Sequence, residues 1–297
     1  MNRSGILVPF AVATLGIALY SGMDAVMKGL SIGIGAYNAL LWRTLAGAAI
    51  GGAVFALRRG SWPQRPAMKL HLLRGSLSAV MAILFFWGLA RVPMAQAIAL
   101  SFVAPLIALY LAAVLLGEKI ERRAILASVL GFAGVLVILS GQAGAELGPE
   151  AMRGSVAILV SAGLYAYNII LMRQQAQVAG PVEVAFFMSA IMAACFLAAA
   201  PVLAVAPTLG DVPAILGAAL LAFASLMLLS WAYARAEAQH LASVEYTGFI
   251  WAALFGFLVF AEPVRPLTAV GAAMIVAACV LAARRGTQPG AALEGAT

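Results

Sequence analysis

Long apolar runs separated by short polar stretches make up most of this chain, from about residue 6 to residue 283. A helix needs about 20 apolar residues to cross the hydrocarbon core of a bilayer, which is roughly 30 Å thick. Ten runs approach that length, the fifth and tenth being short: 6–27, 34–57, 72–90, 95–116, 124–140, 154–172, 182–203, 213–234, 241–261 and 266–283. This pattern predicts an all-α membrane protein with ten transmembrane helices.

The second half of the pattern repeats the first at a constant spacing. Aromatic and charged positions recur 144 residues later (231 − 87) without a gap, as Trp87 and Trp231, Arg91 and Arg235, and Glu118 and Glu262. The same shift places Asp24 on Asn168 and Ser101 on Glu245, so polar positions coincide even where identity is lost. A repeat of this length in apolar sequence predicts a duplicated membrane domain.

This duplication divides the chain into a first repeat at 1–140, an inter-repeat loop at 141–153, a second repeat at 154–285 and a tail at 286–297 that is expected to be disordered. Five helices per repeat make the second half insert in the opposite orientation to the first. A 5+5 inverted repeat of this kind is used for alternating access, with the substrate near the bilayer midplane between the halves.

Composition and charge support a membrane location. A soluble domain has about 25% charged residues, whereas this chain has 10% charged and 64% hydrophobic residues. The net charge of +7 does not indicate nucleic-acid binding, because the basic residues lie in short stretches between apolar runs. If both termini share one side, that side holds most of the 18 Lys and Arg residues, Arg74 included. The positive-inside rule then predicts a multi-pass protein of the cell inner membrane with both termini in the cytoplasm.

Ionisable side chains within the predicted helices are candidates for substrate binding, because each costs about 2.5–3.5 kcal/mol at the bilayer centre on insertion scales. Arg43 could hold a substrate carboxylate, or could satisfy backbone carbonyls or a neighbouring acid. Asp24 and its counterpart Asn168 predict one polar group per half facing a shared cavity, although Lys28, four residues on, could pair with Asp24. Glu245 could hold a cationic amine or a coupling proton, or could reach back to the interface.

Aromatic residues and a proline complete the candidate set. Tyr165, Tyr246 and Trp251 could stack on a planar or cationic ligand. Pro105 lies inside the predicted helix at 95–116, where the missing backbone N–H predicts a kink. That kink could serve gating or could simply shape the bundle.

Other polar residues point away from catalysis. Glu118 and Glu262 end predicted helices and are expected to cap a helix or hold a loop. The two histidines are His71 in a basic loop and His240 at a helix start, and HExxH, GxSxG and P-loop motifs are absent. No enzyme activity, metal or cofactor is therefore expected, and scattered single charges favour a carrier over an open channel.

Several stretches resemble a known family. They are the LHLLRG run at 70–75, the ARVPMAQAIALSFVAPL segment at 90–106 and the VEYTGFIWAALFGFLVFAE run at 244–262. With them the chain resembles the drug/metabolite transporter superfamily, in its EamA-type ten-helix branch, over nearly its whole length. Within that branch it resembles S-adenosylmethionine uptake carriers and amino-acid exporters. The resemblance implies a central cavity lined by the first four helices of each half.

Together these features predict a secondary transporter of a small zwitterionic or cationic metabolite, such as S-adenosylmethionine or an amino acid. An exporter of neutral metabolites or drugs, such as riboflavin, sugars or cationic drugs, is the alternative, and a neutral substrate is favoured if Arg43 and Glu245 neutralise each other. The expected partners are the small-molecule substrate and the lipid bilayer, with no nucleic acid. Proton or exchange coupling and a monomeric or homodimeric state are also expected.

Overall fold

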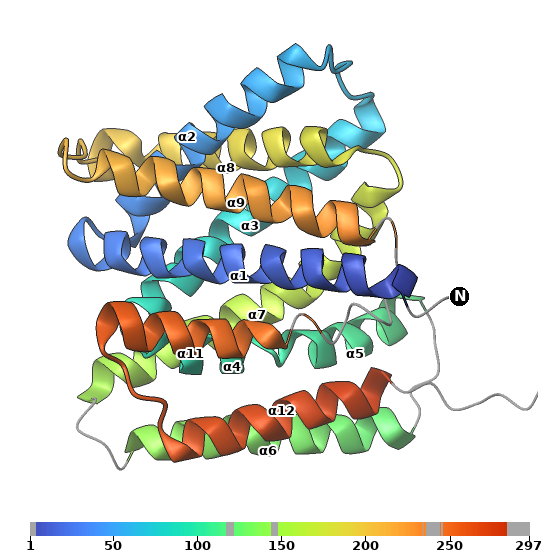
Figure 1. The fold of residues 1–297 in the computed structure, drawn as a ribbon, viewed down its shortest axis with the longest axis vertical. Coiled ribbons are helices and arrows are strands. Elements are labelled where there is room, and N and C mark those ends of the chain that lie inside the picture. Colours follow the sequence, from blue (N-terminus) through green and yellow to red (C-terminus); the bar gives the residue numbers. More distant parts are fainter. Residues whose placement is uncertain are drawn as a thin grey trace, which may run out of the picture.

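The computed structural model describes residues 4–116, 122–143, 148–233, 235, 244 and 246–283. These residues form helices joined by short connections and contain no strand. The helices labelled in Figure 1 are α1 (Ser4–Gly33), α2 (Ala36–Leu57), α3 (Arg65–Leu89), α4 (Met94–Ser101), α5 (Ala104–Leu116), α6 (Arg122–Ala143), α7 (Gly148–Ala176), α8 (Pro181–Leu203), α9 (Val212–Tyr233), α11 (Thr247–Phe260) and α12 (Pro266–Ala283). They lie side by side in one bundle.

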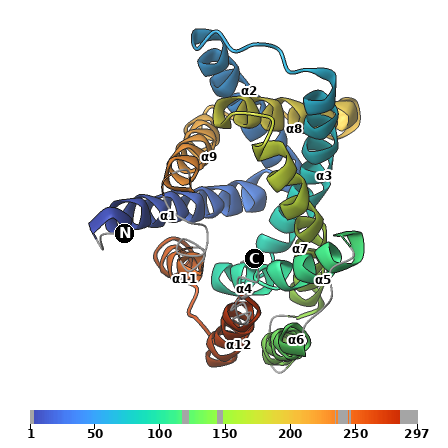
Figure 2. The same cartoon turned by 90° about the vertical axis from the view of Figure 1, so that its right-hand side faces the viewer.

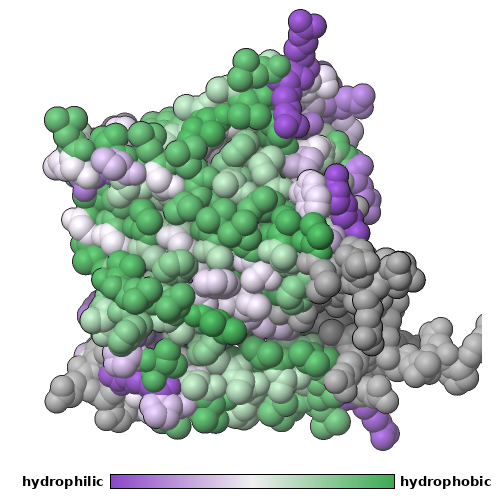
Figure 3. Space-filling view, viewed as in Figure 1, coloured by the Kyte–Doolittle hydropathy of each residue, from purple (hydrophilic) through white to green (hydrophobic). Residues whose placement is uncertain are grey.

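Helix length and apolarity make this a multi-pass membrane protein. Among the described residues, six helices are long and apolar enough to span a membrane: Val8–Gly33, Ala36–Leu57, Arg65–Leu89, Gly148–Met172, Pro181–Leu203 and Val212–Ala232. Shorter apolar helices occupy Met94–Ala108, Ile125–Gly141, Thr247–Phe260 and Pro266–Leu281. Figure 3 shows hydrophobic side chains across the middle of one face, with hydrophilic ones gathered at its right edge near the α2–α3 connection.

The described helices keep the spacing of the sequence repeat. α7 begins 144 residues after α1 (148 − 4), and α12 begins 144 residues after α6 (266 − 122). In Figure 1, α1 runs from right to left whereas α7 runs from left to right, and α6 and α12 are opposed in the same way. α1 packs on α9 as α7 packs on α3, while α2 packs on α8 and α6 on α12. Exchanging the two halves therefore maps this set of contacts onto itself (Figure 2).

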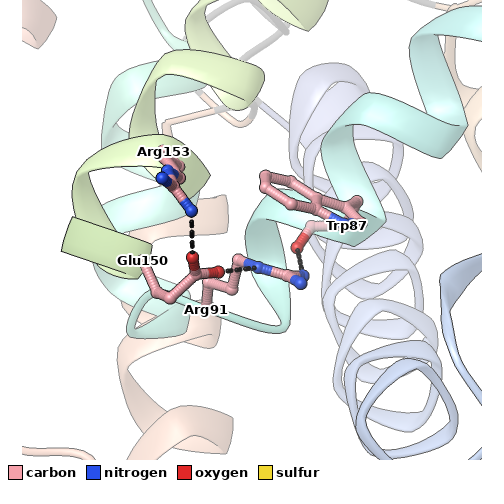
Figure 4. Close-up of polar contacts among 4 residues, drawn as sticks. All are labelled: Trp87, Arg91, Glu150 and Arg153. Carbon is pink, nitrogen blue, oxygen red and sulfur yellow. Dashed lines mark hydrogen bonds and ion pairs between the residues drawn. The ribbon is translucent and has the colours of Figure 1, made fainter. Parts of the chain in front are cut away.

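A local motif is also repeated. At the end of α3, the Arg91 guanidinium lies 3.6 Å from the ring centre of Trp87 and its Nη1 donates to the Trp87 carbonyl at 2.9 Å (Figure 4). In the second half, Arg235 lies 4.2 Å from the Trp231 ring and donates to the Trp231 carbonyl at 3.2 Å. The i, i+4 spacing on a helix brings each arginine over its tryptophan, so both copies fold alike.

Only the first copy of this motif has an acidic partner among the described residues. Arg91 Nε donates to Glu150 Oε2 at 3.0 Å, and Arg153 Nη1 donates to Glu150 Oε1 at 2.7 Å (Figure 4). These bonds join the end of α3 to the start of α7, so the two helices pack antiparallel.

Small residues allow close helix crossings. A Cβ atom on Gly88 of α3 would lie 2.5 Å from the carbonyl oxygen of Gly154 on α7. A Cβ atom on Gly51 of α2 would lie 3.0 Å from Cα of Phe186 on α8, and one on Gly47 would lie 3.0 Å from Ser189 Oγ. The Gly47 and Gly51 spacing therefore serves packing within the bundle, where small residues let backbones approach closely.

The helix predicted at 95–116 is interrupted. α4 ends at Ser101, and Phe102 and Val103 separate it from α5, in which Pro105 is the second residue. Proline has no backbone N–H to donate to the carbonyl four residues earlier, which here belongs to Ser101. The chain instead makes tighter turns around the break, for example from Leu106 N to Val103 O at 3.1 Å.

Candidate substrate-binding site

A cluster of polar side chains lies inside the bundle, on α1, α2 and α7. Asp24 on α1 is 1% exposed, and its charge interacts with that of Arg43 on α2. Tyr20, one turn earlier on α1, interacts electrostatically with both groups and with Tyr165 on α7. Tyr20 and Tyr165 are 49% and 37% exposed, so accessible surface lies near Asp24 and Arg43. The fold thus brings three predicted binding residues, Asp24, Arg43 and Tyr165, to one place.

Two atoms of this cluster have no hydrogen-bond partner. Asp24 Oδ1 and Arg43 Nε are buried and unpaired among the described residues, and so is Trp251 Nε1 on α11. Trp251 stacks against Phe255 with 6.4 Å between ring centres, and α11 packs against α1. Most buried polar atoms in folded proteins are hydrogen-bonded, so an unpaired acceptor and an unpaired donor in one cluster call for an explanation, such as a bound ligand.

Lys28 does not neutralise Asp24. The Lys28 ammonium instead forms an ion pair with Glu262 and donates to the Val92 carbonyl at 2.7 Å. The second carboxylate oxygen of Glu262 accepts from Met94 N at 2.9 Å, which caps the start of α4. Glu262 therefore caps a helix that is its neighbour in space rather than the next helix along the chain, and the Asp24 carboxylate is left to face Arg43.

A second polar network joins α3, α7 and α8. Arg74 Nε donates to Asn168 Oδ1 at 3.2 Å, and its Nη1 donates to Gln175 Oε1. Gln175 Nε2 lies 2.6 Å from His71 Nδ1, and His71 Nε2 lies 2.9 Å from Glu183 Oε1. An amide nitrogen only donates, so the neutral ring accepts at Nδ1 and donates from Nε2 to Glu183. The predicted residue Asn168 is thus oriented by Arg74.

The placement of His71 in a basic loop was wrong, and Arg74, which was assigned to the aqueous side that holds most basic residues, is buried. The predicted segment at 72–90 begins at Arg65 in the structure, so both residues lie within α3, 8% and 1% exposed respectively. Between them, Leu72 and Leu73 are about half exposed and point outward. An apolar count ends the helix at the polar residues, whereas the spacing of three between His71 and Arg74 signals one buried helix face.

The remaining predicted residues lie elsewhere. Tyr246 packs edge-on against Phe102 with ring centres 5.5 Å apart, at the break between α4 and α5. Cys279 Sγ on α12 donates to the Phe102 carbonyl at 3.3 Å and also interacts with Tyr246. Pro105 follows the same break. Glu245 lies outside the described residues, as do Glu118 and His240.

The two ends of the bundle differ in shape. At the Lys28–Glu262 end, the hollow beside Glu262 has a volume of only about 10 Å³. At the other end, a groove of about 380 Å³ opens beside Gln175 and is lined by Pro66, Lys69, Leu70, Leu73, Gln174, Gln177 and Val178. Within the described part of the chain, no three His, Cys, Asp or Glu side chains are grouped to hold a metal ion.

Comparisons with known proteins agree with this architecture. The EamA-like transporter family matches the chain twice, over residues 7–140 and 152–284. The pseudopaline exporter CntI of Pseudomonas aeruginosa is 25% identical over 293 residues, covering 95% of this chain and 96% of the exporter. An uncharacterized transporter of Helicobacter pylori is 26% identical over 203 residues, covering 67% of this chain and 68% of its own length.

One solved crystal structure superposes with a TM-score of 0.62 and covers 93% of this chain and 97% of its own. Its sequence identity of 20% makes it evidence for the fold alone. The two family matches together span nearly all of the apolar sequence, and they coincide with the two halves whose helices keep the repeat spacing. The chain belongs to the EamA-like transporter family of the drug/metabolite transporter superfamily.

Proposed function

We propose that this protein is a secondary transporter that moves a small zwitterionic metabolite across the inner membrane by alternating access. One observation carries the proposal: Asp24 and Arg43 lie on different helices, Asp24 is 1% exposed, and Asp24 Oδ1 and Arg43 Nε are buried atoms without a hydrogen-bond partner among the described residues. A carboxylate suits a substrate amine, and a guanidinium suits a substrate carboxylate in a bidentate geometry. Tyr165 supplies ring surface near this pair, and Trp251 on α11, which packs against α1, has an indole N–H that is unpaired among the described residues.

The proposed mechanism treats the chain as ten transmembrane helices in a 5+5 inverted repeat. The doubled family match, the constant spacing of the helices and the opposed directions of α1 and α7 support this arrangement. In inverted repeats the two halves rock around a site at their interface, which exposes it to each side in turn. In this topology most of the basic residues fall on the side assigned to both termini, which supports a cytoplasmic location for both.

The direction of transport is proposed to be export. A relative that matches this chain over 95% of its length is named an exporter, which supports that direction. Coupling to a proton or to an exchanged solute completes the proposed cycle, since no ATP-binding motif occurs in the sequence.

A second candidate is a carrier of neutral metabolites. The charges of Asp24 and Arg43 interact with each other, which favours mutual neutralisation. In that case each charge is needed only to balance the other. The single variants Asp24→Asn and Arg43→Gln would then be impaired, whereas the double variant would recover.

A ligand-stabilisation screen on detergent-purified protein tests both candidates, because a ligand that binds the native state raises the melting temperature. The panel contains S-adenosylmethionine, neutral, aromatic, basic and acidic amino acids, riboflavin, sugars and cationic drugs. A zwitterion should stabilise the wild type but not Asp24→Asn or Arg43→Gln. Arg153→Gln, at a side chain 68% exposed, is the control and should respond as the wild type does. Stabilisation only by riboflavin or sugars would contradict the zwitterion proposal.

A further inference from the structure

Among the residues that the structure describes, Arg74 is a buried cation without a carboxylate partner. It is 8% exposed, and among the described residues no Asp or Glu oxygen lies within 4.0 Å of its guanidinium. Its two hydrogen-bond acceptors are the amide oxygens of Asn168 and Gln175, which carry no net charge. These two bonds hold the planar group in one orientation while leaving its positive charge uncompensated.

A charge in this condition calls for an explanation, since ionisable groups at membrane depth are expensive and mark functional sites. Glu183 does not supply the missing charge, because His71 and Gln175 stand between it and Arg74. The central cluster does not supply it either. There the Asp24 carboxylate already interacts with the Arg43 guanidinium, so it does not compensate the charge of Arg74.

Arg74 reaches the stretch of α7 that carries Tyr165, because it donates to Asn168, which lies one helical turn further along. Arg74 interacts electrostatically with Tyr165. Tyr165 interacts with Tyr20, and Tyr20 interacts with Arg43 and Asp24. Arg74 lies nine residues from the start of α3, about 14 Å along the helix. It is therefore deep enough to meet a ligand that also reaches the central cluster.

We propose that Arg74 is a second carboxylate-binding position, and that the substrate is an amino-acid derivative with at least two carboxylates. Arg43 holds the carboxylate next to the amine, and Arg74 holds the second. The guanidinium fork matches a carboxylate in two parallel hydrogen bonds, which gives specificity as well as affinity. This inference rests on the proposed function and names the substrate class of the same site.

Matched ligand pairs test it. Glutamate and glutamine differ by one carboxylate at nearly equal size, and 2-aminoadipate and 2-aminopimelate extend the separation of the two carboxylates. Wild-type protein should bind the best dicarboxylate at least tenfold more tightly than its amide, measured as ligand-dependent stabilisation or by calorimetry. In Arg74→Gln that preference should fall to about twofold or less, while the affinity for the amide stays the same. In Arg43→Gln the affinity for both should fall.

A second variant avoids the risk that Arg74→Gln fails to fold. Asn168→Asp places a protein carboxylate where Asn168 Oδ1 now lies, 3.2 Å from Arg74 Nε. This variant should be at least as stable as the wild type, because it pairs a buried charge. It should also lose the dicarboxylate preference, because the guanidinium is already neutralised. A purely structural Arg74 would leave the preference untouched.

The outcomes separate the two proposals. Loss of the preference in both Arg74→Gln and Asn168→Asp supports the second carboxylate position. A dicarboxylate preference that survives in Asn168→Asp overturns the second carboxylate position. Wild-type protein that binds monocarboxylate zwitterions as tightly as every dicarboxylate overturns it too. In either case the proposed zwitterion carrier stands. Wild-type protein that responds to no zwitterion at all overturns the proposed function, and this inference falls with it.

Discussion

Asp24 illustrates how a residue acquires a role through what its neighbours do. Lys28 lies four residues away on the same helix and would be its natural partner, yet Lys28 is committed to Glu262 and the Val92 carbonyl. The carboxylate therefore faces Arg43 across the helix interface, with one oxygen unpaired. The same logic applies to Asn168, which is held by an arginine rather than free to contact substrate from any angle.

Gln175 offers a clean test of the Arg74 network at this scale. Gln175→Leu removes the acceptor of one Arg74 bond and the donor to His71, and so leaves two buried polar groups unpaired. Such a loss lowers the free energy of unfolding by about 1–3 kcal/mol. Each kcal/mol corresponds to about 2–4 °C of melting temperature. Gln174→Leu, at the exposed neighbouring position, is the matched control and should melt with the wild type. Equal melting of the two variants would show that the network adds no stability.

At the scale of helices, one end of the bundle is held by an ion pair that the other half lacks. Lys28 on α1 forms an ion pair with Glu262, which follows α11. The repeat spacing of 144 residues (172 − 28) makes Met172 the equivalent of Lys28 in the second half. The same spacing makes Glu118 the equivalent of Glu262. Because methionine cannot form an ion pair, this connection between helices has no equivalent in the second half.

Lys28→Met imposes the residue of the second half on the first. Removing one partner of a buried pair should destabilise by about 3–5 kcal/mol, because the Glu262 charge is left without its cation. Lys28→Met/Glu262→Met should recover part of that loss, and a double-mutant cycle on thermal unfolding measures the coupling. Glu150→Gln, which breaks exposed pairs at the same end, is the control and should change the melting temperature little. Additive losses in the cycle would contradict a coupled pair.

A second prediction at the scale of helices concerns the close contact between α3 and α7. Gly88→Ala would place a methyl group 2.5 Å from the Gly154 carbonyl oxygen and should destabilise by about 1–3 kcal/mol through overpacking. Gly163→Ala, on α7 with no neighbouring atom within 4 Å, should be neutral or slightly stabilising, because alanine favours helix. Thermal melts of both variants check this, and equal effects would contradict the proposed tight crossing of α3 and α7.

At the scale of the whole molecule, the proposed inverted topology assigns equivalent loops to opposite sides of the membrane. Ser61 lies in the α2–α3 connection and Gly210 in the α8–α9 connection, and both are exposed. With Cys195 and Cys279 replaced, a membrane-impermeant maleimide added to intact cells should label Gly210→Cys but not Ser61→Cys. Permeabilised cells, in which both should be labelled, are the control. Labelling of both positions in intact cells would contradict the inverted arrangement.

Much of the architecture could be predicted from the sequence because it depends on local composition. Lipid offers no hydrogen bonds, so each long apolar run forms a helix that satisfies its own backbone. The apolar runs, the constant shift of 144 residues (231 − 87) and the polar positions Asp24, Asn168 and Arg43 are all visible without a fold. They were sufficient to expect a helical membrane transporter and to name Asp24 and Arg43 as separate candidate binding residues, but not to pair them.

Only the tertiary structure decided how the polar groups pair, because pairing depends on which distant helices touch. Lys28 and Glu262 are 234 residues apart, Arg74 and Gln175 are 101 apart, and His71 and Glu183 are 112 apart. Hydropathy assigns a basic residue near a helix end to the aqueous side, since it scores each side chain alone. A side chain on a facing helix can replace water as the partner of a basic residue. Arg74 and His71 are therefore buried, and Lys28 pairs with Glu262 instead of Asp24.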